Sequence, residues 1–426
     1  MKTIIRCILP AELILLFNLK PFAQTKNWVA LTMELNNPVH VLDTFNGELI
    51  AGGWFTLAGQ LKVSNIASWN GTRWNDMNNG VRGRSSIVKC VLVKDNVLYV
   101  GGMFDSAGTV AARNIAVWDG VKWSAVGKGV NSEVTSMTLF NDEIHISYYD
   151  SAGGANGHDV ARWDGANWIP LGAGIRNAIR DICVYKDELY VVGFFDYAGN
   201  FPCRNIARWD GTAWDSLINV LNDHSSLIVW NDRLLIGSAK EHYIPLNDTD
   251  HVMQWDGKSL SKFSSHDIIN IRDFFVFNDE LYCAGYGVYK WNPALKQMEG
   301  IGSGLRQHVF ALAEYKGELY CGGSFSTDQK SSINFIGRLA PVNRVNPVLN
   351  RGNVHIFPNP VNNDFRVTGN DIKQISILNI SGQCIYQQKA YSYETLINLP
   401  SIACGIYFLQ VVQENNEVFR SKLIKQ

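Results

Sequence analysis

The sequence predicts an all-β protein, made of a seven-bladed β-propeller followed by a small C-terminal Ig-like β-sandwich. A similar unit recurs at a spacing of roughly 45 residues, which is in the range of propeller blades. Glycine and tryptophan are abundant, at 37 and 13 residues, as expected for many short strands joined by turns. No tryptophan follows Trp291, and residues 353–426 show a different pattern of short alternating runs.

The first 23 residues have the features of a secretory signal peptide. Lys2 and Arg6 give a basic start, a short apolar run extends from Leu13 to Phe17, and Ala23 offers a cleavage point. The apolar run is too short to span a bilayer. No later segment has about 18 consecutive apolar residues, so we expect no transmembrane helix.

The repeated unit has a recognisable core within residues 24–340. Its clearest copy is LYVGGMFDSAGTVAARNIAVWDGVKW, from Leu98 to Trp123, and two close copies run from Leu49 to Trp74 and from Leu189 to Trp214. The first tryptophan of each unit marks the register, and a leucine takes its place in the last copy. These marker positions are Trp69, Trp118, Trp163, Trp209, Trp255, Trp291 and Leu339, which makes seven copies.

Each copy predicts four strands, which we call a to d. Strand a is an apolar run, a tight turn leads to strand b with its Gly-Gly pair, strand c carries the marker tryptophan, and strand d carries a second one. Asp-Gly or Asn-Gly separates strands c and d, as at Asp119-Gly120. This dipeptide favours a two-residue type I′ hairpin. Such a hairpin would place Ala116 opposite Trp123.

The two ends of the propeller region complement each other. The last copy ends near Leu339 without a strand d of its own, whereas the segment from Asn27 to Leu31 matches a strand d with its tryptophan, Trp28. We expect this N-terminal strand to complete the last blade. A ring closed in this way has no exposed sheet edge.

The Gly-Gly pair after strand b, the Trp-Asp pair after strand c and the tryptophan of strand d resemble kelch and galactose-oxidase-like propellers. The resemblance covers residues 24–340. The unit has Trp-Asp-Gly where kelch repeats usually have a tyrosine, and the fifth and sixth copies are irregular. The resemblance implies an architecture and no particular activity.

A change of composition marks the end of the repeats. Residues 341–352 predict a linker, with Pro341, Pro347 and several asparagines. Seven short alternating runs follow in residues 353–426, which is typical of a small β-sandwich. The runs are Val354–Phe357, Asp364–Val367, Gln374–Asn379, Cys384–Gln388, Thr395–Leu399, Gly405–Val412 and Val418–Ile424.

This C-terminal region resembles the type A sorting domain of the type IX secretion system. The matching segments, in the order expected, are FPNPVNNDFRV (357–367), ILNISGQCIY (377–386), INLPSIACGIYFLQV (397–411) and SKLIKQ (421–426). The resemblance implies that the type IX secretion machinery is a partner and that the chain crosses the outer membrane of a Gram-negative bacterium. The domain is then usually cut off, and the cargo is released or fixed to the cell surface.

Charge and cysteine content exclude several classes. With 38 basic and 39 acidic residues the net charge is −1, which gives no electrostatic case for a nucleic-acid partner. An odd number of cysteines would follow the signal peptide, without CxxC spacing, which argues against a disulfide framework or a zinc site. Cys90, Cys183, Cys283 and Cys321 fall on strands and are expected to be buried; Cys384 and Cys404 could pair.

The predicted turns make one face of the ring a candidate binding surface. The a–b and c–d turns are tight, so the variable b–c loops and d–a connections share the other face, where function concentrates. Asp105, Asp150 and Asp196 are equivalent there; they could bind a cation or sugar hydroxyls, although caps of their own turns are the favoured explanation. Trp54 could stack on a sugar or be a core aromatic.

The long loop of the fifth copy contributes His242 and Tyr243, with Asp248, Asp250 and His251. Their spacing fits no compact metal motif, and we predict no metal, cofactor or catalytic residue. A Gly-x-Ser-x-Gly element is absent. The sequence therefore favours a protein that binds an unknown protein or glycan. An extracellular enzyme acting on polysaccharide and a structural spacer remain the alternatives.

Overall fold

The structure is a computed structural model of the chain. It describes residues 26–31, 33–149, 160–217, 224–238, 252–264, 270–302, 305, 307–325 and 333–341, and, nearer the C-terminus, 355–357, 364–368, 372–379, 383–390, 394–399, 402–403, 405–413 and 418–425. These residues form strands and turns without a helix, so the all-β prediction is confirmed. One compact unit covers Thr25–Pro341, and another contains the C-terminal residues.

The larger unit is built from antiparallel sheets that repeat one pattern along the chain. The first sheet contains β2 (Val39–Phe45), β3 (Glu48–Gly53), β6 (Ile66–Trp69) and β7 (Trp74–Asn75); the second β9 (Ile87–Lys94), β10 (Val97–Met103), β13 (Ile115–Trp118) and β14 (Trp123–Ala125); the third β15 (Glu133–Phe140), β16 (Glu143–Tyr149), β17 (Val160–Trp163) and β18 (Trp168–Pro170).

Four further sheets continue the pattern. The fourth sheet contains β19 (Ile175–Tyr185), β20 (Glu188–Ala198), β21 (Phe201–Pro202), β22 (Ile206–Trp209) and β23 (Trp214–Ser216), and the fifth contains β24 (His224–Trp230), β25 (Arg233–Ser238), β26 (Met253–Trp255) and β27 (Leu260–Lys262). The sixth sheet contains β28 (Asp273–Phe277), β29 (Glu280–Gly285), β30 (Gly287–Asn292) and β31 (Gln297–Gly300). The last sheet contains β32 (Val309–Tyr315), β33 (Glu318–Gly323), β34 (Ile336–Pro341) and β1 (Lys26–Ala30). Two short ribbons are formed by β4 (Leu57–Ala58) with β5 (Leu61–Lys62), and by β8 (Val81–Arg82) with β11 (Ser106–Ala107) and β12 (Val110–Ala111).

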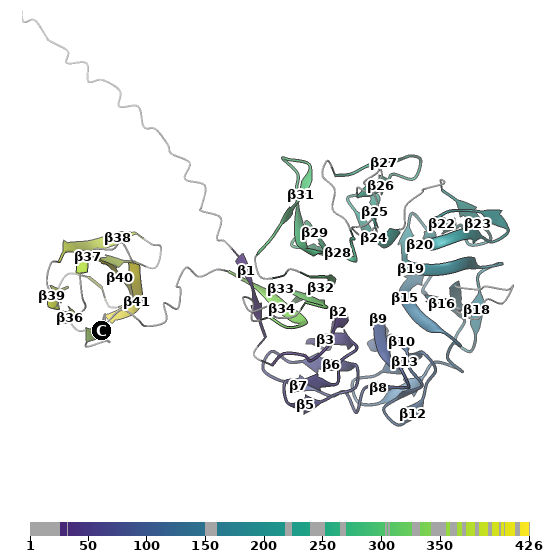
Figure 1. Cartoon of the computed structure of the whole chain (residues 1–426), viewed down its shortest axis with the longest axis horizontal. Helices are drawn as coiled ribbons and strands as arrows, with labels where there is room; N and C mark the ends of the chain where they lie inside the picture. Colours follow the sequence, from purple (N-terminus) through teal and green to yellow (C-terminus); the bar gives the residue numbers. More distant parts are fainter. Residues whose placement is uncertain are drawn as a thin grey trace, which may run out of the picture. The chain divides into compact units, whose positions relative to one another are not determined.

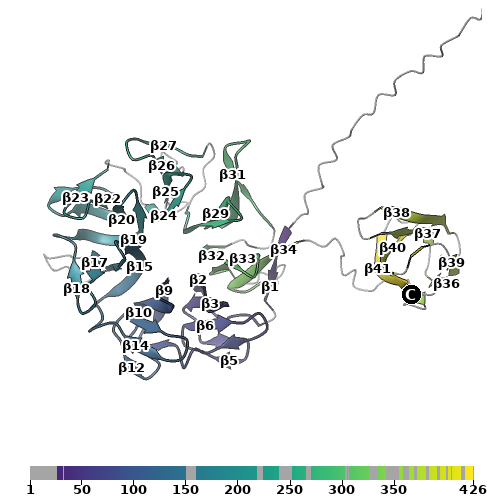
Figure 2. The same cartoon turned by 180° about the vertical axis from the view of Figure 1, so that it is seen from behind.

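These sheets surround a common centre as a β-propeller (Figures 1 and 2). The first strand of each sheet is innermost, and each of these strands contacts the inner strand of the next sheet around the ring. Strand β1 closes the ring, because it pairs with β34 and sets Trp28 opposite Leu339. Trp28 is buried, and its indole N–H donates to the Ile301 carbonyl at 3.0 Å. The predicted closure by the N-terminal strand is confirmed.

The outer strands of each sheet correct one predicted register. Trp118 lies opposite Trp123, and Ala116 lies opposite Ala125, so the c–d loop has four residues and is not a type I′ hairpin. The Asp119 carboxylate accepts hydrogen bonds from the amides of Val121 and Lys122, both at 2.8 Å. These bonds stabilise the longer loop. The sequence signal was ambiguous because Asp-Gly suits both kinds of turn.

Type I′ geometry occurs instead at the a–b turns, where two residues join the strands. Asn141 and Asp142 both have positive φ angles, of 53° and 61°, and Phe140 pairs with Glu143 across them. The equivalent pairs are Asn46-Gly47, Asp95-Asn96, Lys186-Asp187, Asn231-Asp232, Asn278-Asp279 and Lys316-Gly317. Both turns at this end of the sheets are therefore short, as predicted.

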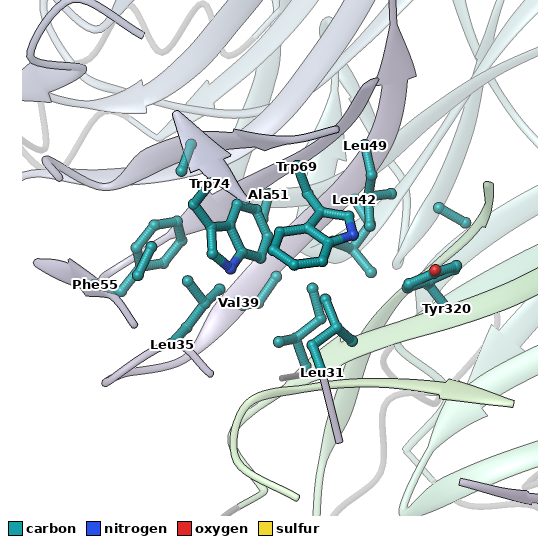
Figure 3. Packing of buried hydrophobic residues seen from close by; sticks show 14 of the residues in the cluster. Leu31, Leu35, Val39, Leu42, Leu49, Ala51, Phe55, Trp69, Trp74 and Tyr320 are labelled. Carbon is teal, nitrogen blue, oxygen red and sulfur yellow. The ribbon is translucent and has the colours of Figure 1, made fainter. Parts of the chain in front are cut away.

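The tryptophans of strands c and d form an outer seam, which we define as the opposed pairs Trp69/Trp74, Trp118/Trp123, Trp163/Trp168 and Trp209/Trp214, with Leu339/Trp28 in the last sheet. The four Trp/Trp pairs have ring centroids 5.1–5.3 Å apart. Figure 3 shows one such pair packed between Leu31 and Leu35 on one side and Ala51 on the other. The seam fills the space between neighbouring sheets with large apolar surfaces.

Seven strands are described in residues 355–425, and their ends lie within two residues of the predicted runs. They are β35 (His355–Phe357), β36 (Asp364–Thr368), β37 (Ile372–Leu378), β38 (Cys384–Lys389), β39 (Glu394–Asn398), β40 (Gly405–Gln413) and β41 (Val418–Lys425). Strands β35, β36 and β39 form one sheet, and β38, β37, β40 and β41 form the other. One hydrophobic cluster joins Phe365 and Ile397 of the first sheet to Ile375, Leu409 and Leu423 of the second.

The described cysteines are free. Cys90, Cys283 and Cys321 are buried, as expected, and Cys183 is half-buried. Cys384 is exposed and unpaired, so the suggested disulfide from Cys384 is not formed; Cys404 lies outside the described residues.

Candidate functional site

The b–c segments and d–a connections lie at the end of the sheets opposite the short turns. Several of these segments are themselves folded. Strands β4 and β5 make a hairpin within the first b–c segment, and β8 of a d–a connection pairs with β11 of the next b–c segment. This face of the propeller, which we call the loop face, therefore presents side chains from ordered ribbons.

Large apolar side chains stand exposed on the loop face at one repeated position. Trp54, Met103, Phe194 and Tyr286 each follow the last residue of the strand-b glycine motif or its variant, and they are 59%, 40%, 58% and 53% exposed. The interpretation of Trp54 as a core aromatic is therefore wrong. Its side chain is exposed and cannot fill the core, and Met103 at the end of β10 and Phe194 within β20 are exposed at the same register position.

Asp196 lies next to Phe194 and is held by two neighbours. Arg176 donates two hydrogen bonds to its carboxylate, at 2.9 and 2.6 Å, and Asn177 donates a third at 3.2 Å. The bond from Arg176 lowers the pKa of Asp196, so the carboxylate stays ionised. The guanidinium of Arg176 also lies over the ring of Tyr197, 4.0 Å from its centroid.

The other predicted site residues do not share this environment. The backbone of Asp105 is part of a ribbon, since its N–H donates to Arg82 at 2.8 Å and its carbonyl accepts from Ala112 at 3.0 Å; its side chain is exposed. Asp150, His242 and Tyr243 lie outside the described residues. The carbonyl of Asp196 accepts the equivalent bond from the amide of Cys203 at 3.0 Å, so the two aspartates share this backbone setting. The bonds from Arg176 and Asn177 are those described for the Asp196 carboxylate.

Close packing at the strand-b glycines shapes the inner strands. A Cβ atom on Gly102 would lie 2.0 Å from the carbonyl oxygen of Ile87 on the neighbouring strand a, and a Cβ on Gly101 would lie 2.7 Å from Val134 of the next sheet. The first sheet repeats both contacts at Gly53 and Gly52. Only glycine allows strands a and b to approach so closely here.

A β-bulge occurs in strand a beside these glycines in six of the described inner strands. In the sixth sheet the strand begins one residue later, and the amide of Arg272 bonds to Ala284 instead. A bulge re-aims the extra side chain. The residues at this position, which we call the inner ring, are His40, Lys89, Thr135, Arg180, Ser225, Arg272 and Phe310.

Sequence analysis missed the inner ring, although a signal existed. Each member stands twelve positions before the first glycine position of strand b, as with His40 and Gly52, or Lys89 and Gly101. The chemistry at this fixed spacing varies from blade to blade, whereas the surrounding apolar positions repeat. Variation at one register position within a regular repeat could have singled out these residues.

Aromatic and imidazole rings link three sheets across part of the inner ring. His40 stacks on Phe310 with centroids 4.9 Å apart, Phe310 lies parallel to His308 at 6.2 Å, and His308 meets exposed Tyr286 edge-on at 5.4 Å. Burial, with the nearby charges of Lys89 and then Arg272, lowers the pKa of His40 to about 3. His40 is therefore neutral at physiological pH.

Two open grooves lie away from the ring centre. The larger, of about 1000 Å³, runs beside Met33, Leu61 and Trp74, with the polar residues Glu34 and Asp76 also lining it. The smaller, of about 560 Å³, lies between the first two sheets near the short turns and includes Glu48 and Trp118. Both are shallow and mix polar with apolar walls.

Two kinds of feature are absent from the described residues. Within these ranges no group of three or more His, Cys, Asp or Glu side chains could hold a metal ion. The same part of the chain contains no helix long and apolar enough to cross a membrane.

Comparisons with solved structures show the fold. The extracellular domain of BT4673 from B. thetaiotaomicron has a TM-score of 0.52 at 12% identity, over 93% of this chain and 58% of that one. The WD40 β-propeller domain of Doa1 has a TM-score of 0.51 at 11% identity, over 74% of this chain and 96% of that one. PorZ, a surface component of the type IX secretion system of Porphyromonas gingivalis, gives a TM-score of 0.48 at 13% identity, over 93% and 60%.

The chain spans about three fifths of the BT4673 and PorZ chains, and no curated protein matches it. Residues 355–426 match the family described as "Secretion system C-terminal sorting domain". This match confirms the sorting domain expected from the segments around Phe357, Ile377 and Ile397. The protein is a secreted or cell-surface β-propeller whose C-terminal residues belong to the secretion-system sorting-domain family.

Proposed function

We propose that this protein is an exported binding protein whose loop face recognises a protein or glycan. The observation that carries the proposal is the repeated exposure of Trp54, Met103, Phe194 and Tyr286 at equivalent positions of four sheets. A single exposed apolar side chain needs no explanation, but large apolar side chains exposed at the same position of several sheets on one face form a surface suited to recognition. Rings of this kind stack on apolar faces of sugars or enter protein interfaces.

The polar neighbours of Phe194 support the same function. Arg176, Asp196 and Tyr197 form one fixed group, because an ion pair and a cation–π contact hold the guanidinium. Polar groups that are already held in place beside an apolar surface can orient a ligand at little entropic cost. The low pKa of Asp196 makes this carboxylate an acceptor of hydrogen bonds and a poor general acid.

The proposal includes the wider architecture. The ring is a seven-bladed propeller of kelch-like type over residues 24–340, preceded by a signal peptide at 1–23. A linker at 341–352 leads to an Ig-like sorting sandwich at 353–426, which directs type IX secretion. The repeated strand pattern of the sheets supports the blade count, and the common core of the two C-terminal sheets supports the sandwich.

The binding function is tested with a triple variant, Trp54→Ala, Phe194→Ala and Tyr286→Ala, on the full chain. We expect loss of binding on a glycan array or in cross-linking to native outer-membrane material, with unchanged thermal stability. The matched control is Val121→Ala, because Val121 is 73% exposed on a short turn at the opposite face. Equal binding by the triple variant and the wild type would rule out the loop-face aromatics as the recognition surface.

A further inference from the structure

Two of the exposed aromatic side chains on the loop face have the same surroundings. Trp54 of the first sheet and Phe194 of the fourth are each followed by a buried phenylalanine and then by an exposed polar residue, Thr56 or Asp196. This alternation of exposed and buried side chains sets the aromatic ring and the polar group on the same side of the chain. An apolar surface and a hydrogen-bonding group therefore occur together in both sheets.

The polar residue of the first sheet is held by a second segment. The Asn36 amide nitrogen donates to the Thr56 hydroxyl oxygen at 3.0 Å. The Asn36 amide oxygen accepts from the backbone N–H groups of Thr56 and Leu57, both at 2.9 Å. Asn36 and Thr56 are both exposed, so the Thr56 O–H is fixed in position and can still donate to a ligand.

Arg176 takes the place of Asn36 in the fourth sheet, where it makes the ion pair with Asp196. The cross-strand pairs that establish this equivalence are Leu35/Ala58 and Ile175/Ala198. The side chains of Arg176 and Asp196 are 59% and 49% exposed, so hydroxyl groups can reach them. The opposite charges of the pair compensate each other, and the polar pair of the first sheet carries no charge.

A further apolar side chain follows on the hairpin of each sheet. Leu61 lies opposite Ala58, and Phe201 lies opposite Ala198. Leu61 is 39% and Phe201 61% exposed. Leu61 also lines the groove of about 1000 Å³, which leaves room for a ligand that extends past the hairpin.

The second sheet lacks this combination. Met103 replaces the aromatic ring. Arg82, at the position of Arg176, donates to the Ser64 hydroxyl at 3.3 Å instead of binding the aspartate of its own sheet. Among the described residues, the first and fourth sheets thus carry the complete set of groups, which we call a subsite: Trp54 with Asn36 and Thr56, and Phe194 with Arg176 and Asp196.

The chemistry of the subsites matches a sugar. A pyranose has an apolar face that packs on an aromatic ring and hydroxyl groups that exchange hydrogen bonds with fixed polar side chains. Because neither subsite has a net charge, a neutral sugar fits better than a uronic acid. Equivalent subsites on separate sheets suit a ligand that itself repeats, whereas the core of a protein interface is one contiguous apolar patch.

We propose that the loop face binds a neutral polysaccharide through these subsites, with a pyranose ring on Trp54 or Phe194 and its hydroxyl groups on the polar pair beside it. The inference rests on the proposed binding function and narrows its ligand to a glycan.

The test is affinity electrophoresis of the full chain in gels that contain xyloglucan, galactomannan or dextran, which are neutral, or polygalacturonate, which is acidic. We expect at least one neutral polymer to retard the protein and polygalacturonate not to do so. Trp54→Ala and Phe194→Ala should each weaken binding roughly three- to tenfold through loss of ring stacking. The double variant should bind more weakly than either, because both subsites engage one polymer. Val121→Ala is the control, since Val121 lies at the opposite face.

A variant that gains binding guards against loss of folding. Asp196→Asn leaves the Arg176 guanidinium without its compensating charge, so the variant should be retarded by polygalacturonate, a result that an unfolded protein cannot give. Absence of this gain would overturn the assignment of Arg176 and Asp196 to a subsite. Retardation by polygalacturonate alone, retardation by no polymer, or equal retardation of the double variant and the wild type would overturn the inference.

The loop-face triple variant separates this inference from the proposed function. If no neutral polymer binds but the triple variant loses its cross-linking to an outer-membrane protein, the ligand is a protein; the glycan inference then fails and the loop-face function stands. If the triple variant binds every partner as the wild type does, both fail.

Discussion

The outer seam on strands c and d and the inner ring on strand a each recur at the same position in successive sheets. The side chains of the seam are conserved from sheet to sheet, and those of the inner ring are not. In the seam the same indole pair recurs, with ring centroids 5.1–5.3 Å apart in four sheets. In the inner ring a cation, an imidazole, a hydroxyl and a phenyl group occupy the same backbone position. The difference teaches that the indole pairs repeat because they fill the same space between sheets, whereas the bulged position of strand a accepts side chains of different chemistry without a change of fold.

The sharpest way to break the seam is at the strand that closes the ring. Trp28→Ala should lower the free energy of unfolding by about 3–5 kcal/mol, because it removes a buried indole and its bond to Ile301. Deletion of residues 24–33 should be worse, since it exposes the edge of β34. Urea unfolding of the full chain measures both effects.

The control for this prediction is another tryptophan outside the seam. Trp54→Ala removes a side chain that is 59% exposed and should change the free energy of unfolding by no more than about 0.5 kcal/mol. Similar losses for Trp28→Ala and Trp54→Ala would contradict the distinction between seam and surface.

The frame of the inner ring depends on the glycines of strand b. Gly102→Ala would push a methyl group to 2.0 Å from the Ile87 carbonyl oxygen, and backbone cannot move as a side chain does. We expect a loss of about 1–3 kcal/mol in the free energy of unfolding. Gly300→Ala is the matched control, because the nearest atoms to its new methyl group lie 3.9 Å away. If both variants unfold alike, close packing at Gly102 does not maintain the bulge.

Much of the fold could be predicted from the sequence because one marker residue recurs at the same place in each repeat and so aligns the strands of all the copies. Six marker tryptophans and Leu339 lie on strand c of the seven sheets, and Trp28 lies on the closing strand that its sequence context predicts. The c–d register failed at Asp119-Gly120, where the side chain of the aspartate stabilises a four-residue loop. Composition alone does not distinguish this loop from a type I′ turn.

The candidate site was harder to predict. Trp54 looked like a core residue because Met103 and Phe194 share its position, yet all three are exposed. The bulge that creates the inner ring leaves no composition signal, since it arises from contact between two strands. Only the constant spacing between residues such as His40 and Gly52 carries that information, and it requires the strand pairing to be known.

The last prediction concerns how the stability of the inner strands depends on pH. Burial raises the folded-state pKa of Asp181 to about 6 and that of Asp273 to about 7, above the ordinary value of 3.8. A raised pKa means that the folded state holds more protons than the unfolded state between these values. The stability contributed by each group is therefore complete below about pH 4 and is lost as the pH rises toward 6 or 7, by at most about 1.4 kcal/mol per pH unit for each carboxyl.

Asp181→Asn with Asp273→Asn should remove this fall, as measured by urea unfolding at pH 4, 5, 6 and 7. The opposite trend should then become visible, because burial lowers the pKa of His40 to about 3 and that of His145 below its usual value. A histidine whose pKa is lower in the folded state than in the unfolded state makes the free energy of unfolding increase as the pH rises toward 6.5. A difference in the free energy of unfolding between wild type and double variant that stays constant with pH would show that burial does not raise the pKa of these two carboxyls.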